Sequence, residues 1–523
     1  MLNDPIMRPR LVVAMFDAQS GRAGDALLAL DQIVAELGTA PSYTRAVVEY
    51  IRAIAAFELG EYEDGLAAID LCIEIADAID EPGWESVARS LRVAIRARMA
   101  AGDGESIDDL VRAEATLAAS ADRELVAWAH VGLGSAYQVL RLYELALPHR
   151  EFSTRNPLDV IGLPESEVID WLNLADCNLR IVQELEQLAD PALSAEIDAA
   201  RRDAANAART ALQVSVRDGL DDRWSGTARL DLAIAQWPAD PTGAADVLAG
   251  FAAQSRARSL GQEAVIATCF QARALAAAGD LAGALSVIDS ATAVADTTAI
   301  DPDIATLLHW TAVQISAAAG QPGGGAGRRF GIAVSRRWWS ERERSLWAVR
   351  NALALEQLEQ DYQKERLAAR RDALTGVGNR RAFDEWLAHA DDSGWPVVLL
   401  SVDIDDFKSL NDTFGHAYGD AILVAVARAL QPHAQTDNLV ARSGGDEFAV
   451  LVRDDGETDV DAIRADVRAA LASISDVGDF AARPDIGVSI GAASTNEGLA
   501  LASLMAVADR RMYDDKRSNR TLV

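Results

Sequence analysis

The chain has 523 residues, half of them hydrophobic, and its 80 acidic against 49 basic residues give a formal net charge of −31. This length suggests two to four domains, and the apolar content excludes a disordered chain. A surface this negative repels nucleic-acid phosphates and anionic membranes, so neither is an expected partner.

The cysteines and the N-terminal sequence together predict a cytoplasmic protein. Cys72, Cys177 and Cys269 lie far apart in apolar helical patterns without metal-binding spacing, which is typical of reduced thiols. The first residues lack the apolar run of a signal peptide. No stretch of the sequence is long and apolar enough for a transmembrane helix.

Residues 1–320 are rich in Ala, Leu, Glu and Arg and follow a helical period. Val47, Ile51 and Phe57 share one helical face, and the turn at 59–62 precedes a second helix. Comparable turns follow at 101–103, 140–143 and 278–281. This pattern resembles tetratricopeptide repeats, although the turns are more widely spaced than is usual there. We expect an all-α solenoid that binds an unknown protein or peptide on its concave face; a plain helical bundle is the alternative.

Residues 321–334 are rich in glycine and predict a linker. Residues 335–371 predict a charged helix with an apolar stripe that approximates heptads, with one slip near Leu355. The stripe consists of Trp339, Leu346, Val349, Leu353, Leu358, Tyr362 and Leu367. We expect this connecting helix to dimerise the chain as a coiled coil; a helix that packs on its own domain is the alternative.

In residues 372–523, an apolar run over 397–402 predicts a buried strand that ends at Asp403. The sequence Gly444-Gly445-Asp446-Glu447 lies between apolar runs and predicts a β-hairpin with two acids at its tip. Carboxylates from separate strands suit Mg²⁺, and glycines let phosphates approach the main chain. A solvated acidic hairpin is the alternative.

The same region carries four motifs in order. They are Asp372-Ala373-Leu374-Thr375-Gly376-Val377-Gly378-Asn379-Arg380-Arg381; Asp403 to Lys408 with Asn411-Asp412, Gly415-His416 and Gly419-Asp420; Arg442 to Phe448; and Ala508-Asp509, Met512-Tyr513 and Lys516. Together they closely resemble the GGDEF family, the bacterial diguanylate cyclases. The resemblance implies a ferredoxin-like α/β domain, similar to nucleotide cyclases, that joins two GTP into cyclic di-GMP and releases two pyrophosphates. It also implies a homodimer, because the reaction joins two substrates.

The resemblance implies a role for each matched residue. Asp403, the carbonyl of Ile404 and Asp446 would hold two Mg²⁺ ions, for which Mn²⁺ could substitute. Asp446 and Glu447 would be the catalytic acids, and the choice of general base between them stays open. The remaining positions that match GTP-binding sites of the family are Phe407, Lys408, Lys516 and Arg520.

Asn411 and Asp420 match the residues that read guanine in the family. A carboxylate accepts from guanine N1–H and from the exocyclic amine, and an amide both donates and accepts, so this pair favours GTP over ATP. His416 lies between them, at a position that the family places near the nucleotide, where direct contact and a purely structural role remain alternatives.

Two departures from the family pattern stand out. Asn519 precedes Arg520 where the family usually has glycine. Many members also carry an Arg and an Asp before the Gly-Gly pair as an inhibitory product site, whereas Gln435 and Asn438 stand there in this chain. We therefore expect no inhibitory product site.

The leading hypothesis is an active diguanylate cyclase regulated by the helical region at 1–320. The alternative is a catalytically silent GTP-binding scaffold whose repeat region acts as an interaction adaptor. Silent members usually lose the signature acids or the guanine pair, and this chain keeps both. A third hypothesis, an adaptor with incidental cyclase activity, requires an activity that is indifferent to partners of the helical region.

Overall fold

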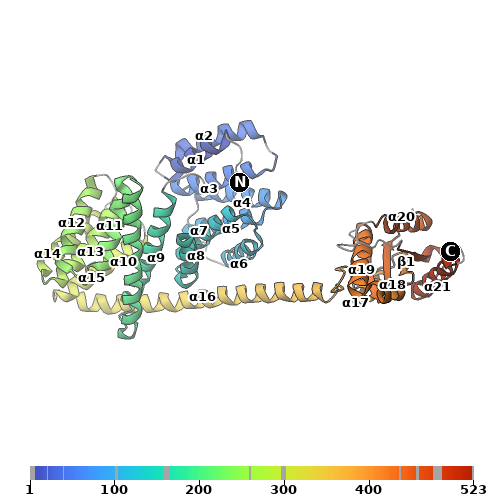
Figure 1. The fold of residues 1–523 in the computed structure, drawn as a ribbon. Coiled ribbons are helices and arrows are strands. Elements are labelled where there is room, and N and C mark those ends of the chain that lie inside the picture. The colour runs from blue at the N-terminus through green and yellow to red at the C-terminus, as the bar shows by residue number, and fades with distance from the viewer. Residues whose placement is uncertain are drawn as a thin grey trace. The chain divides into compact units, whose positions relative to one another are not determined.

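The computed structural model forms two compact units, residues 1–357 and 358–523 (Figure 1). It describes residues 6–19, 22–38, 40–99, 104–156, 165–257, 261–295, 302–434, 437–454, 459–474 and 486–520.

The first unit is helical throughout its described residues. Its helices are α1 (Met7–Gln19), α2 (Ala23–Leu37), α3 (Tyr43–Leu59), α4 (Tyr62–Ala78), α5 (Pro82–Arg98), α6 (Gly104–Ala119), α7 (Arg123–Val139), α8 (Tyr143–Arg155), α9 (Ser166–Leu188), the 3-10 turn η1 (Pro191–Leu193), α10 (Ser194–Arg217), α11 (Asp222–Gln236), α12 (Pro241–Ala257), α13 (Gly261–Ala277), α14 (Leu281–Ala295), α15 (Pro302–Ala318) and the start of α16 (Gly324–Ala368). The helical character is confirmed, and the tetratricopeptide-like arrangement stays a prediction. Among the described helices of the whole chain, none combines the length and apolar character needed to cross a membrane.

Three of the predicted turns join consecutive helices. Gly60 ends α3 in the left-handed conformation, with φ of 77°, and its N–H donates to the Phe57 carbonyl at 3.1 Å. Gly279 has φ of 92° between α13 and α14, and Arg141 has φ of 62° between α7 and α8. Glycine reaches this region without strain, so it is the usual residue at such helix ends. The predicted turn at 101–103 lies outside the described residues.

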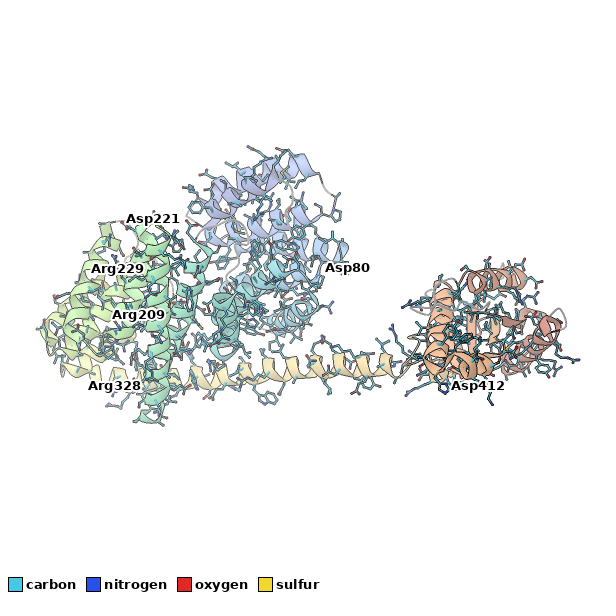
Figure 2. All side chains as sticks on the ribbon, viewed as in Figure 1. Asp80, Arg209, Asp221, Arg229, Arg328 and Asp412 are labelled. Carbon is cyan, nitrogen blue, oxygen red and sulfur yellow. The ribbon has the colours of Figure 1, made fainter. Side chains whose placement is uncertain are left out.

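The apolar faces of these helices form the core of the unit. Val47 and Ile51, predicted on one face of α3, are buried against Leu30 and Ile33 of α2 and against Trp84 of α5. Charged residues lie both inside this unit and on its surface. Arg209, Asp221 and Arg229 in the α10 and α11 region are exposed examples (Figure 2).

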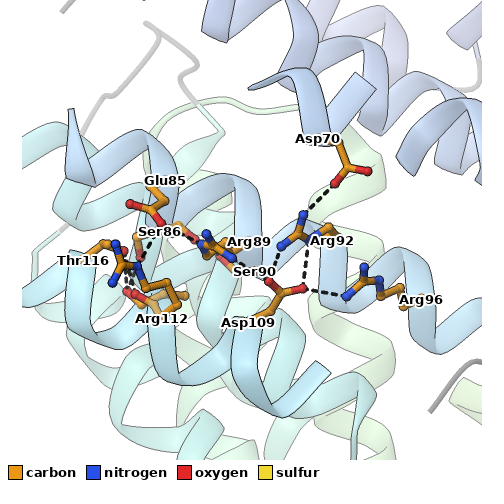
Figure 3. Close-up of polar contacts among 11 residues, drawn as sticks. Asp70, Glu85, Ser86, Arg89, Ser90, Arg92, Arg96, Asp109, Arg112 and Thr116 are labelled. Atoms are coloured by element: carbon orange, nitrogen blue, oxygen red, sulfur yellow. Dashed lines mark hydrogen bonds and ion pairs between the residues drawn. The ribbon is translucent and has the colours of Figure 1, made fainter. Parts of the chain in front are cut away.

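An ionic network also ties α5 to α6 (Figure 3). Asp109 of α6 is 2% exposed and accepts hydrogen bonds from Arg89, Arg92 and Arg96 of α5. Arg92 also donates a hydrogen bond to the carboxylate of Asp70 on α4, at 2.6 Å. Three arginines thus compensate the negative charge of the buried Asp109 carboxylate.

The predicted linker at 321–334 is mostly helical, because α16 begins at Gly324 rather than at Ser335. Close packing against α15 explains the glycines. A Cβ on Gly324 would lie 2.8 Å from main-chain atoms of Ser316 and Ala317, and one on Gly331 would overlap the indole of Trp310. These glycines allow two helix backbones to approach each other, and they do not break the chain.

The apolar stripe of α16 is divided in two. Leu346 and Val349 are 8% and 1% exposed and pack into a cluster of the first unit that also contains Tyr137 of α7. Leu358 and Tyr362 are 66% and 58% exposed. The predicted single dimerisation seam is therefore wrong for the first half of the helix, which packs on the helical unit. Dimerisation through the second half stays a prediction.

The second unit contains one four-stranded sheet and several helices. Its elements after α16 are α17 (Arg380–Ser393), β1 (Val397–Ile404), α18 (Phe407–Phe414), α19 (His416–Leu430), η2 (Gln431–His433), β2 (Leu439–Gly444), β3 (Glu447–Arg453), α20 (Val460–Ala472), β4 (Val488–Ser494), η3 (Thr495–Glu497) and α21 (Leu501–Arg520). All neighbouring strands are antiparallel, in the order β2-β3-β1-β4. This order and the β-α-β-β-α-β succession agree with the predicted ferredoxin-like arrangement.

Strand β1 is the centre of this unit. All eight of its residues are buried, as the run of apolar and small residues at 397–402 predicts. Alternate side chains face opposite sides of the sheet. Val398 and Leu400 pack with α19 and α20, and Val397 and Leu399 pack with α17 and α21. Helices therefore cover both faces of the sheet at β1.

Candidate active site

The two predicted acidic strand ends meet. Asp403 of β1 lies directly opposite Glu447 of β3 in the antiparallel register. Residues opposite each other in such a pair share one face of the sheet, with Cβ atoms roughly 5 Å apart. Asp403 is 8% exposed, whereas Glu447 is exposed at the start of its strand. The structure thus brings together carboxylates from two separate strands.

The hairpin between β2 and β3 turns on two residues. Gly444 pairs with Glu447, which leaves Gly445 and Asp446 as the turn. Gly445 has φ of 54°, a left-handed value that favours glycine. The predicted hairpin is confirmed; of its two predicted tip acids, Asp446 lies in the turn and Glu447 begins β3.

Arg442 holds this turn in place through hydrogen bonds. Its Nε and Nη2 donate to the carbonyl of Gly445 at 2.8 and 2.6 Å, and its Nη1 donates to Asp372 at 3.2 Å. Asp372 also accepts from the backbone N–H and the hydroxyl of Thr375 at 2.9 and 2.6 Å. Burial alone would raise the pKa of Asp372, but the hydrogen bonds from Thr375 and Arg442 lower it overall.

The main chain joins the same two motifs. The N–H of Gly378 donates to the carbonyl of Val440 at 2.9 Å, and the N–H of Arg442 donates to the carbonyl of Gly378 at 2.7 Å. The motif at 372–381 therefore supports the hairpin that carries Asp446. In the sequence analysis, Asp372 and Arg442 belong to the motifs but have no assigned role in the site.

Glu447 lies within a group of acids. Its pKa is raised, first by partial burial and then by the negative charges of Asp509, Asp403 and Asp446, whereas Lys516 lowers it. Two strands, one turn and α21 contribute these side chains. Such a concentration of one sign of charge is unfavourable by itself and is suited to a bound cation.

Lys516 of α21 is the cation of this group. Its ammonium group forms an ion pair with Asp403. Partial burial alone would lower the pKa of Lys516, but the hydrogen bond to Asp403 and the charges of Asp405 and Asp446 raise it overall. The predicted phosphate-binding lysine therefore lies beside the predicted metal ligands.

Asp509 is a member of the group that the sequence analysis did not single out. It lies on α21 and accepts a hydrogen bond from Ser401 of β1 at 2.7 Å. In the sequence, its place in the fourth motif indicates a role for Asp509. Only the packing of α21 on β1 shows that this carboxylate reaches Glu447.

The acids fit a magnesium ion. Within the described ranges, no three Asp, Glu, His or Cys side chains form a ready-made metal cage. Mg²⁺ needs none, because it commonly uses one or two protein carboxylates and takes its other ligands from water and substrate phosphates. Asp403, Asp446 and the carbonyl of Ile404 at the end of β1 can supply such ligands. An ion there would compete with Lys516 for Asp403.

The predicted guanine-reading residues lie on consecutive helices. Asn411 lies on α18 and Asp420 in the first turns of α19. A Cβ on Gly419 would overlap the side-chain amide of Asn411, so this amide lies against α19 at the residue before Asp420. Gly419 is needed for that approach. His416 begins α19 and is exposed.

The other predicted residues take different places. Phe407 is partly buried against the core of the sheet, and Lys408 is exposed in the first turn of α18. Asn438 accepts a hydrogen bond from the N–H of Arg453 at 3.1 Å and so caps the strand pair. Gln435 and the side chain of Arg520 lie outside the described part of the structure.

The four motifs, the sheet order and the acidic strand ends agree with one protein family. The family described as diguanylate cyclase, GGDEF domain, matches residues 369–521. This part of the chain is a GGDEF domain. Residues 1–357 lie outside that match.

Curated relatives share the GGDEF domain. Diguanylate cyclase DosC of Escherichia coli K12 is 34% identical over 160 residues, which are 29% of this chain and 34% of DosC. Cyclic di-GMP phosphodiesterase PdeR of the same strain is 33% identical over 159 residues, 30% of this chain and 24% of PdeR. The chain therefore spans about a third or less of these relatives.

Among solved structures, the coiled coil and GGDEF domain of DgcB from Caulobacter crescentus, in complex with c-di-GMP, is 28% identical. The match covers 33% of this chain and 94% of that one, with a TM-score of 0.29.

Proposed function

We propose that the GGDEF domain is an active diguanylate cyclase that converts two GTP into cyclic di-GMP and two pyrophosphates. The observation that carries this proposal is the position of Asp403 opposite Glu447, with Asp446 in the adjoining turn and Lys516 beside them. The signature acids are all retained, and they occupy one end of the sheet. The name of the relative DosC supports the same activity.

In this reaction the 3′-hydroxyl of each GTP attacks the α-phosphorus of the other. An O–P bond forms, the bond to the β-phosphate oxygen breaks, and pyrophosphate leaves. Two Mg²⁺ ions held by Asp403, Asp446 and the Ile404 carbonyl would neutralise phosphate charge and activate the hydroxyl. Asp446 or Glu447 accepts the hydroxyl proton. Lys516 places a compact positive charge beside the phosphates.

Asn411 and Asp420 supply base specificity in this proposal. The carboxylate of Asp420 accepts from the two donors of the guanine edge, and the amide of Asn411 donates and accepts beside it. Adenine leaves these groups unpaired. A polar site that is left unpaired by the wrong substrate discriminates strongly.

Catalysis requires two copies of the domain, since each holds one GTP. We infer a homodimer that forms through the exposed second half of α16, where Leu358 and Tyr362 present apolar surface. The helical unit at 1–357 would regulate the reaction, because α16 runs without interruption from this unit to residue 368.

A second candidate is a silent GTP-binding scaffold. One observation favours it: the relative PdeR, 33% identical over 159 residues, is named a phosphodiesterase. In that case the acids would bind nucleotide without turnover, and the helical unit would carry the working surface.

One assay separates the two candidates. The full-length protein is incubated with GTP and Mg²⁺, and the products are identified by mass spectrometry. We expect cyclic di-GMP and pyrophosphate in a ratio of one to two, and no cyclic product from ATP. Nucleotide binding by calorimetry without any product would support the scaffold and contradict the cyclase.

A further inference from the structure

The helical unit contains a large cavity, with a volume of about 1170 Å³. Its walls come from α7, α8, α9, α15 and α16, together with the starts of α4 and α13 and the end of α5. All of its lining residues belong to the first unit. The cavity is therefore separate from the GGDEF active site.

The lining of this cavity is richer in arginine than the chain as a whole. Acidic residues outnumber basic ones 80 to 49 overall, whereas five arginines and three acids line the cavity. The charged lining residues are Arg98, Arg141, Arg150, Arg180, Arg342, Glu184, Asp303 and Glu341. The lining therefore places several guanidinium groups around one cavity, and such groups bind carboxylates and phosphates.

Several of these arginines already have carboxylate partners. Arg141 pairs with Glu184 at 2.7 Å, and Arg180 pairs with Asp176 at 2.9 Å. Arg342 pairs with Glu144. These ion pairs hold the walls together and leave little net charge, so the cavity does not resemble a site for a polyphosphate.

Arg150 of α8 is different. It is 4% exposed, and its guanidinium donates only to neutral groups: the Ser135 hydroxyl at 3.0 Å, the Gln138 side chain at 3.2 Å and the Val131 carbonyl at 3.4 Å. Within the described residues, no carboxylate forms an ion pair with it, and its Nε has no hydrogen-bond partner.

Burial of an unpaired cation is costly, and proteins rarely keep one without a function. Burial accordingly lowers the pKa of Arg150 from its usual value. The surrounding residues nevertheless accommodate the side chain. A Cβ on Gly134 of α7 would lie 3.0 to 3.3 Å from the Nε, Cδ and Cζ atoms of Arg150, so the glycine lets the guanidinium lie flat on α7.

We propose that this cavity binds a small organic anion whose carboxylate or phosphate group pairs with Arg150. A charge-assisted bond to an arginine is strong, and a bidentate one also fixes orientation. Arg342 lines the same cavity and has a buried Nη1 without a partner, which offers a second donor. The glutamines of the wall can pair with further polar groups of the ligand; they are Gln138, Gln183, Gln187 and Gln262.

The ligand would touch the helix that leads to the catalytic domain. Trp338, Glu341, Arg342 and Ser345 of α16 form part of the cavity wall. An anion that draws Arg342 toward the cavity competes with the contacts that Arg342 makes to Glu144 and to the Arg141 carbonyl. A ligand can bias an output helix only through such differential contacts. This regulatory consequence rests on the proposed cyclase activity, whereas binding does not.

The test is calorimetric titration of the full-length protein, without nucleotide, against succinate, citrate, inorganic phosphate, glucose 6-phosphate and triglutamate. We expect at least one small anion to bind at submillimolar concentration. Arg150→Gln should weaken that binding about tenfold or more, since a charge-assisted contact is lost. Arg155→Gln is the matched control, because Arg155 lies on the same helix and is exposed.

Gly134→Ala supplies a second variant that keeps the charge and displaces the guanidinium, so it should also weaken binding. No binding at millimolar concentration by any small anion overturns the proposal, as does equal binding by the Arg150→Gln protein. Binding of triglutamate alone would replace the small anion by an acidic peptide segment.

A measurement without ligand separates a binding role from a structural one. The thermal midpoint of the Arg150→Gln protein should equal or exceed that of the wild type, since an unpaired buried charge is removed. A large fall would make Arg150 a structural residue and overturn the proposal. If the wild-type protein binds the anion but shows no cyclase activity, the proposed function is refuted, whereas the proposed binding site stands.

Discussion

Two groups of acidic side chains, one in each unit, are compensated differently. In the helical unit, Asp109 accepts from three arginines, and Glu186 pairs with both Arg201 and Arg273. In the GGDEF domain, Glu447 lies among three other acids, and Lys516 is the cation that offsets them. The first arrangement is complete within the fold, and the second becomes favourable only when a cation binds.

This difference between compensated and uncompensated charges helps to distinguish a structural charged cluster from a ligand site. Compensated charges stabilise helix packing, whereas an excess of one sign marks a place for a ligand of the opposite sign. Arg150 and Asp231 are exceptions within the helical unit, and Arg150 lines the large cavity there. Each of the following variants tests one side of this contrast.

The largest effect is expected at the hairpin tip. Asp446→Ala should lower the rate of cyclic di-GMP synthesis about a thousandfold or more, because a metal-binding carboxylate is lost at a turn where truncation leaves no cavity. The rate is measured by product chromatography, and circular dichroism checks the fold. Asp412→Ala is the control, since this acid is exposed on α18 (Figure 2). A wild-type rate for Asp446→Ala would contradict the metal assignment.

On the compensated side, Asp109→Asn should lower the free energy of unfolding by about 3–5 kcal/mol, because three arginines lose a buried partner. Urea denaturation followed by circular dichroism measures the change. Asp70→Asn is the matched control: its side chain pairs with the same Arg92 but is 51% exposed. Its loss should cost less than about 1 kcal/mol. Equal losses for the two variants would show that burial does not distinguish them.

The guanine pair should give an intermediate effect. Asn411→Ala and Asp420→Ala should each lower kcat/KM for GTP by roughly tenfold to a hundredfold, as expected when a polar group of the substrate loses its partner. Magnesium dependence should stay unchanged, because neither residue belongs to the acidic group. Equal turnover of ATP and GTP by the wild type would refute this role for the pair.

The smallest effect concerns the two halves of α16. Leu358→Asp combined with Tyr362→Asp should weaken self-association severalfold and lower the specific activity with it, without a change in thermal stability. Leu346→Asp should instead destabilise the helical unit, because Leu346 is buried there. Light scattering and thermal denaturation measure the two outcomes. An unchanged dimer in the double variant would move the contact elsewhere.

The elements that local chemistry controls could be predicted from the sequence. A run of apolar and small residues predicts the buried strand β1, and Gly444-Gly445 between apolar runs predicts the hairpin, because strand burial and turn geometry depend on neighbouring residues. The four ordered motifs were enough to identify the GGDEF domain. Asp446 lies in the predicted turn, Glu447 begins β3, and Asp403 is the last residue but one of β1.

The use that distant helices make of the same residue types is visible only in the tertiary structure. The glycines at 321–334 suggested a break, yet Gly324 and Gly331 permit close packing of α16 on α15. The apolar stripe suggested one seam, yet packing against the helical unit covers its first half. Asp509 belongs to the fourth motif, but the sequence did not show which groups surround it or Arg150, since the burial and charge around a side chain come from helices far away in the sequence.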